Sequence, residues 1–185
     1  MLLWVWVVVV ALVMATVTVV AAKLTLRPAG PAHVLVIPSK IGSFIRRLQL
    51  EKEMNAKALE NEMVAKSAGQ ASHLVSAVYE NRAGISGGSH AQIILFIGGK
   101  LSGVTPGAFI SGFTQQYPGS HPAPAGQLGG SAACVNARST AVGNVSMCTW
   151  ADDDTFGVLV SLTMSLTQLS GEIGTIRPAV EHAAR

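Results

Sequence analysis

The stretch that decides the fold is SAACVNARSTAVGNVSMCTWADDDTFGVLVS, residues 131–161. It contains short apolar runs at residues 131–136, 145–151 and 156–161, and each is separated from the next by a polar segment. Runs of this length with turn-forming residues between them are typical of consecutive β-strands. We therefore expect a three-stranded antiparallel unit built from two hairpins.

The first hairpin brings the cysteines together. Cys134 and Cys148 are the only two cysteines of the chain, and they are symmetric about Ala141. In an antiparallel ladder, directly opposed residues that do not exchange hydrogen bonds have Cα atoms about 4.5 Å apart, which a disulfide accepts. Two unpaired buried thiols are the alternative, and a zinc site would need nearby histidines that the sequence does not offer. We expect a Cys134–Cys148 disulfide.

The second hairpin contains three consecutive carboxylates, Asp152 to Asp154. If the chain turns through them, Trp150 lies opposite Gly157, and a tryptophan laid over a cross-strand glycine is a favourable packing arrangement. Aspartates are common in turns because their side chains accept hydrogen bonds from nearby backbone N–H groups. We interpret the triplet as a solvated turn. A weak calcium site is the alternative, although the alternating ligands and the glycine of a calcium loop are absent.

The remaining pattern predicts one α/β (α+β) domain over residues 33–185. Prolines and glycines mark residues 117–130 as a loop, whereas Thr105-Pro106 and the Ser165–Gln168 capping box mark helix starts. Further strands are expected at residues 33–37, 71–80 and 91–97, and helices at 46–66, 105–116 and 165–180. We expect a two-layer domain with a mainly antiparallel sheet of about five or six strands and the helices packed on one face.

The N-terminal segment is apolar throughout. Residues 2–22 carry no charge, and as a helix they would span roughly 31 Å, about the thickness of a hydrocarbon core. We expect residues 1–22 to form a transmembrane helix (or uncleaved signal anchor) in contact with membrane lipid, and residues 23–32 to form a linker. A cleaved signal peptide is the alternative, because Val20-Ala21-Ala22 suits signal peptidase, but the apolar core is too long and lacks a basic leader.

Charge does not settle the orientation. Lys23 and Arg27 follow the apolar segment, which by the positive-inside rule places the domain in the cytoplasm. A disulfide instead requires an oxidising compartment, and we favour a single-pass protein of the cell membrane with its C-terminal domain outside the cytoplasm. The net charge of +3 is spread thinly over the rest of the chain, so nucleic-acid binding is not expected.

No catalytic set emerges from the sequence. Gly84 to Gly88 fits the letters G-x-S-x-G around Ser86, but the motif needs a strand before the serine and a helix after it, and here a strand follows. The histidines, at positions 33, 73, 90, 121 and 182, lack metal-binding spacing and are expected on the surface. We therefore assign no catalytic, cofactor-binding or metal-binding residues and expect no cofactor.

Three segments carry a family resemblance: LGGSAAC (128–134), CTWADDDTFGVLVS (148–161) and IRPAVEH (176–182). The chain resembles uncharacterised actinobacterial (Streptomyces-type) single-pass membrane-anchored proteins with a small extracytoplasmic α/β domain carrying paired cysteines. It departs from them by lacking their cytoplasmic leader. The resemblance implies a location and a fold, and it implies no activity.

These observations favour a membrane-tethered extracytoplasmic interaction or sensing domain of unknown ligand, without catalytic activity and with a protein partner possible. One alternative is a small cell-envelope hydrolase that uses Ser86 or a carboxylate of Asp152–Asp154. Another is a subunit of a larger membrane protein assembly.

Overall fold

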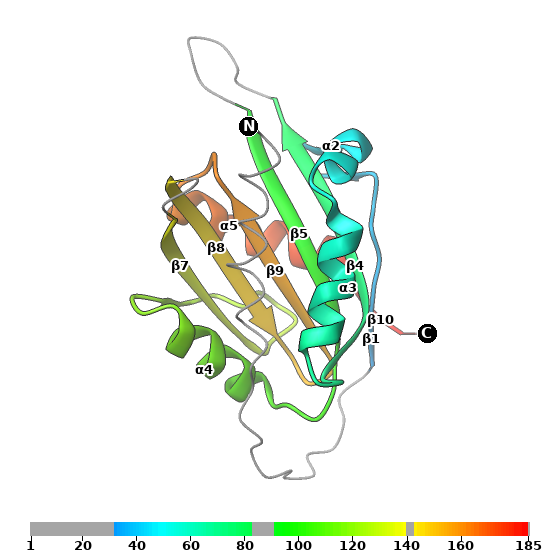
Figure 1. Cartoon of the computed structure of the whole chain (residues 1–185), viewed down its shortest axis with the longest axis vertical. Helices are drawn as coiled ribbons and strands as arrows, with labels where there is room; N and C mark the ends of the chain where they lie inside the picture. The colour runs from blue at the N-terminus through cyan, green and yellow to red at the C-terminus, as the bar shows by residue number, and fades with distance from the viewer. Residues whose placement is uncertain (1–31, 83–90, 140–142, 185) are drawn as a thin grey trace.

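The computed structural model describes residues 32–82, 91–139 and 143–184. In this part of the chain, four α-helices surround a large antiparallel sheet (Figure 1). The helices are α2 (Leu48–Glu53), α3 (Ala56–Lys66), α4 (Pro106–Gln116) and α5 (Leu166–Val180). The strands are β1 (His33–Leu35), β2 (Lys40–Ile41), β3 (Phe44–Arg46), β4 (Ala71–Asn81), β5 (Gln92–Leu101), β6 (His121–Ala123), β7 (Ser131–Ser139), β8 (Gly143–Ala151), β9 (Thr155–Ser161) and β10 (Glu181–Ala183). The predicted α+β class is confirmed.

The main sheet has eight strands in the order β2-β3-β4-β5-β9-β8-β7-β6, and every pairing in it is antiparallel. It is larger than the predicted sheet because β6 forms inside the segment expected to be loop, and because β2 and β3 make a short hairpin at the other edge. A separate ribbon pairs β1 with β10, so the first and last described strands lie side by side.

The hairpins of residues 131–161 have the predicted register. Cys134 lies directly opposite Cys148 and forms a disulfide with it, with a Cα–Cα distance of 4.1 Å. Trp150 lies opposite Gly157, and a Cβ added at Gly157 would come within 2.2 Å of the tryptophan ring. The glycine is therefore required by the close approach of the ring. Trp150 also stacks on Phe96 of β5, with ring centroids 5.9 Å apart.

Helix starts agree closely with their sequence signals. Thr105 caps α4 by accepting a hydrogen bond from the backbone N–H of Ala108, and both hydrogen bonds of the Ser165–Gln168 capping box are present at α5. The helix expected over residues 46–66 is instead two helices, α2 and α3. Asn55 separates them in a left-handed conformation with φ 52°, which asparagine adopts more readily than most residues.

The helices cover both faces of the sheet, so the predicted one-sided, two-layer arrangement is wrong. Helices α2, α3 and α4 cover what we call the first face, through buried residues that include Met63 and Phe113. Helix α5 and the β1–β10 ribbon cover the opposite, second face, where Ile173 and Ile176 pack with Trp150 (Figure 1). The domain therefore has three layers.

The physical reason lies in the central strands. In β9, Val158 belongs to the core of the first face and the adjacent Leu159 to the core of the second. Successive strand residues point to opposite faces, so a strand that is apolar at every position needs a cover on both sides.

Among the described residues, no helix is long and apolar enough to cross a membrane. The segment predicted as a membrane helix, residues 2–22, lies outside the described part of the chain, as does the linker up to residue 31.

Candidate functional site

A buried arginine organises a polar cluster at the end of α5. Arg177 lies on the sheet-facing side of α5, and its side chain is 1% exposed. Its Nε donates to Glu181 Oε2 at 3.0 Å, and its Nη2 donates to Glu181 Oε1 at 3.1 Å and to Asp152 Oδ2 at 2.9 Å. Its Nη1 donates to the carbonyl oxygens of Ala125 and Gly129, at 2.7 and 2.5 Å. Since a guanidinium has five N–H donors, every donor of Arg177 is used.

Asp152 fixes the acidic turn from inside the protein. Its Oδ1 accepts hydrogen bonds from the backbone N–H groups of Asp154 and Thr155 and from the Thr155 hydroxyl, at 3.1, 2.7 and 2.9 Å. The triplet is therefore a turn, as predicted, but its first residue is 6% exposed and is not solvated. Its side chain turns inward because Arg177 supplies a buried charge for it to pair with.

The two carboxylates beside Arg177 have opposite pKa shifts. Burial tends to raise the pKa of Asp152, but hydrogen bonding with Glu181 and from Asp154 and Thr155 outweighs it and holds the pKa well below its usual range. Burial raises the pKa of Glu181, and the neighbouring Asp152 carboxylate raises it further against the opposing effect of Arg177. Where two buried carboxylates meet, one keeps its charge and the other more readily binds a proton. Here Asp152 is the charged partner.

Glu181 also connects the cluster to the aromatic core. Its Oε2 accepts a hydrogen bond from the indole Nε1 of Trp150 at 3.0 Å, and the Arg177 guanidinium lies 6.0 Å from the centroid of the tryptophan ring. The structural role predicted for Trp150 thus extends beyond its contact with Gly157.

The outer half of the cluster holds the N-terminal strand. The backbone N–H of His33 donates to Asp154 Oδ2 at 2.7 Å, and His33 Nδ1 lies 3.1 Å from Asp154 Oδ1. Lys100 Nζ donates to the same carboxylate at 3.1 Å and to the carbonyl oxygen of His33. Strand β1 is therefore attached to the acidic turn through both the main chain and the side chain of His33.

Three side chains of this cluster lie close enough together to be considered as ligands of a metal ion. One ligand atom from each of His33, Asp152 and Asp154 lies within 4.8 Å of the other two. However, Arg177 already pairs with Asp152 and Lys100 pairs with Asp154, so a bound cation would have to displace these partners. Because Arg177 and Lys100 already balance the charges of these two carboxylates, the cluster fits a structural ion-pair network better than a metal centre.

Three of the four described histidines are placed as the sequence predicts. His73, His121 and His182 are exposed, in agreement with the expectation, but the His33 side chain is only 14% exposed and faces three carboxylates. Ser86, one of the two candidates for the hydrolase alternative, lies outside the described residues, as does His90.

The sequence contained one signal for the cluster that the prediction did not use. Arg177 lies in the last turn of α5, and Glu181 follows four residues later as the first residue after the helix. Arg177 also directly follows Ile176 of the apolar stripe. A pair of opposite charges at i,i+4 beside an apolar stripe is compatible with burial, but nothing in the local sequence identifies Asp152 as the partner. Residues 125–129 supply only backbone carbonyls, which no sequence pattern reveals.

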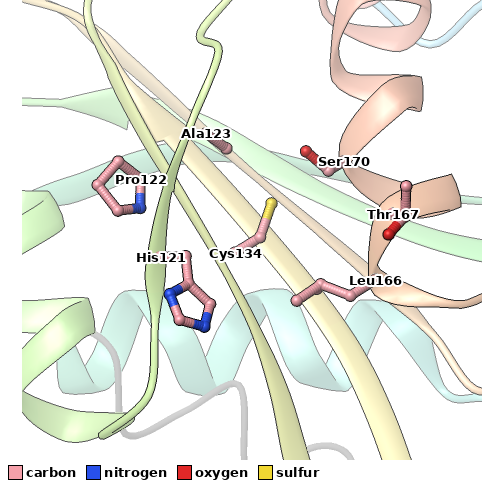
Figure 2. A pocket seen from close by; sticks show the side chains of 7 residues that line it. All are labelled: His121, Pro122, Ala123, Cys134, Leu166, Thr167 and Ser170. Atoms are coloured by element: carbon pink, nitrogen blue, oxygen red, sulfur yellow. The ribbon is translucent and has the colours of Figure 1, made fainter.

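A pocket of about 230 Å³ opens at the other end of the second face. It lies between the edge strand β6 and the start of α5, and is lined by His121, Pro122, Ala123, Cys134, Leu166, Thr167 and Ser170 (Figure 2). The lining is small and mixed in polarity, with one imidazole and two hydroxyl groups. It suits a small ligand, because pockets for drug-sized molecules usually exceed about 300 Å³.

No protein-family model matches the chain, and no curated protein or solved structure matches it significantly. The resemblance to actinobacterial membrane-anchored proteins therefore stays a prediction.

Proposed function

We propose that the protein is a membrane-tethered extracytoplasmic interaction or sensing domain, held at the cell membrane by residues 1–22, with no catalytic activity. The proposal is supported by the apolar N-terminal segment and by the disulfide between the two cysteines, since disulfides persist mainly in oxidising compartments.

The observation that carries the proposal is the attachment of β1. His33 follows the apolar segment after residues 23–32, which can span at most about 35 Å when fully extended. At His33 the chain is held by Asp154, by Lys100 and by pairing with β10. A firm attachment of the chain so close to the membrane suits a domain whose position relative to the bilayer matters, as in binding or sensing.

The polar cluster argues against hydrolysis by the acidic turn. Asp152 accepts four hydrogen bonds, and Asp154 is held by His33 and Lys100. A general acid or base needs a free side chain within reach of substrate, and these carboxylates are engaged in holding the fold.

Location is tested with the full chain expressed in its membrane. We expect it to resist extraction by alkaline carbonate, and we expect protease added to intact spheroplasts to degrade the domain. Release by carbonate, or protection of the domain until the membrane is permeabilised, would contradict the proposal.

Interaction is tested by site-directed photo-crosslinking in the same cells. A photoreactive residue at exposed Thr167, beside the pocket, should give an adduct of defined mass, whereas the same residue at exposed Val64 on α3 serves as the control. The same adduct at both positions, or at neither, would count against a specific binding surface here.

A further inference from the structure

The two sulfur atoms of the disulfide lie in different surroundings. Cys134 is 3% exposed and lines the pocket between β6 and α5, whereas Cys148 is 0% exposed. In Figure 2 the Cys134 sulfur points into the space between β6 and α5. The bond can therefore be approached from one side.

The sheet topology explains this asymmetry. Cys148 lies on β8, between β7 and the fully buried strand β9, where it is opposite Leu159. Cys134 lies on β7, whose outer neighbour is the three-residue edge strand β6, with exposed His121 directly opposite. A short edge strand ending in a proline- and glycine-rich loop leaves an opening that a full-length strand would close.

We propose that this pocket is an exchange site at which a low-molecular-weight thiol attacks Sγ of Cys134. The attacking thiolate forms a mixed disulfide with Cys134, and the bond between Cys134 and Cys148 breaks. Cys148 leaves as a thiolate and takes up the proton that the incoming thiol has lost. A second molecule of the thiol then attacks the mixed disulfide, so that two thiols are oxidised to one disulfide and both cysteines are reduced.

The lining of the pocket fits this chemistry. Exchange needs a thiolate and access to one sulfur, and an imidazole beside the site, such as that of His121, favours the thiolate form. A volume of about 230 Å³ admits a small thiol. Only Cys134 lines the pocket, whereas Cys148 is enclosed, so attack is expected at the Cys134 sulfur.

The inference deepens the proposed function by naming what the domain senses, and it rests on that function for the oxidising location in which the bond forms. The exchange itself is measured on purified full-length protein in detergent micelles. If no exchange is observed with the purified protein, the proposed membrane location is not affected. If the domain is found in the cytoplasm, the exchange measured with the purified protein still stands.

The first experiment starts from the oxidised protein, in which the Cys134–Cys148 disulfide is intact. The protein is incubated with 2-mercaptoethanol under native conditions, quenched by alkylation, and followed by mass spectrometry. We expect a rate proportional to thiol concentration. Because access controls the rate, Thr167→Trp, which fills the mouth of the pocket, should slow reduction about tenfold. Val64→Trp on the first face should leave the rate unchanged.

Two outcomes would overturn the proposal. A rate that is independent of thiol concentration would mean that reduction waits for global unfolding. An equal rate for Thr167→Trp and Val64→Trp would mean that the pocket is not the route.

The second experiment compares the single thiols. In Cys148→Ala the remaining thiol faces the pocket, and in Cys134→Ala it is enclosed, so an aromatic disulfide reagent should react faster with the first variant by at least about tenfold. Circular dichroism checks that both variants are folded. Equal reactivity in folded variants, or faster reaction of Cys148, would contradict the assigned direction of attack.

Discussion

Replacing Gly157 by alanine tests the packing of the second face most sharply. A Cβ at this position would lie 2.2 Å from Cζ2 of Trp150 and 2.5 Å from both Cε2 and Cη2. The ring cannot move aside easily, because it stacks on Phe96 at an interplanar angle of 8° and donates a hydrogen bond to Glu181. Adding one methyl group should therefore displace a fully buried tryptophan.

The expected loss has two parts. Overpacking a well-packed core usually costs about 1–3 kcal/mol. If the indole shifts enough to lose its hydrogen bond, buried Glu181 loses a partner, which costs a further ~1–3 kcal/mol. Together the two parts lead us to expect Gly157→Ala to lower the free energy of unfolding by about 2–6 kcal/mol, a large part of a typical domain's stability.

The assay is urea denaturation followed by circular dichroism, with the full chain in detergent micelles. Gly174→Ala is the matched control, because Gly174 is exposed on α5 with no atom within 4 Å of an added Cβ. That variant should be neutral or more stable by about 0.5–1 kcal/mol, as alanine is the better helix former. A Gly157→Ala protein as stable as the control would refute the packing described for Trp150.

Further predictions concern the polar cluster and the disulfide. Arg177→Met should lower the free energy of unfolding by about 3–5 kcal/mol, because it leaves two carboxylates buried without their cation; urea denaturation measures this, and wild-type stability would contradict it. The pKa of Asp152 is lower in the folded than in the unfolded state, where it is about 3.9. The Asp152 carboxylate therefore stabilises the folded state at pH values above about 3.9, and this stabilisation is lost as the pH falls further. Unfolding free energies between about pH 5 and pH 2 should therefore fall less steeply for Asp152→Asn than for wild type, and parallel slopes would argue against it. Glu181 has the opposite sign, since its raised pKa favours the folded state at low pH and this contribution is lost as the pH rises through the folded-state value. Glu181→Gln should remove that loss from the stability curve at mildly acidic pH, and an unchanged curve would count against the raised pKa. Cys134→Ala should cost about 2–4 kcal/mol, from the entropy of a closed loop of ~15 residues, and an equal urea midpoint with and without the bond would exclude that contribution.

The hairpins of residues 131–161 were predictable because their signals are local. The symmetric spacing of Cys134 and Cys148 gave the register, and Trp150 opposite Gly157 followed from it. Helix starts at Thr105 and Ser165 were predictable for the same reason, because capping depends on residues within one turn.

The layering of the domain depends on information that was present but not used. The continuous apolar runs of β5 and β9, such as residues 93–97 and 156–160, indicate strands buried on both faces. The prediction that all helices cover one face did not take this pattern into account, and it is wrong for α5, which covers the second face. Likewise, Asn55 in the middle of a helix-forming run was the local signal for the break between α2 and α3.

The polar cluster could not be assembled from sequence. Its members come from β1, the β8–β9 turn, β5, the end of α5 and the start of β10, and the pair His33 and Asp154 is separated by 121 residues. A buried charge such as Arg177 is recognised only when its partners are known to be close. The pocket beside Cys134 depends in the same way on β6, a short strand in a segment whose composition indicates loop.

We propose that this domain is held outside the cytoplasm with its cysteines joined. The most direct measurement is thiol counting in cells: the full chain is acid-trapped without reductant, denatured, alkylated and weighed by mass spectrometry. We expect the chain to take up no alkyl group, because Cys134 and Cys148 are its only cysteines and are bonded to each other. Uptake of two alkyl groups per chain in cells to which no thiol was added would contradict this expectation, because both cysteines would be free and the oxidising location would lose its support.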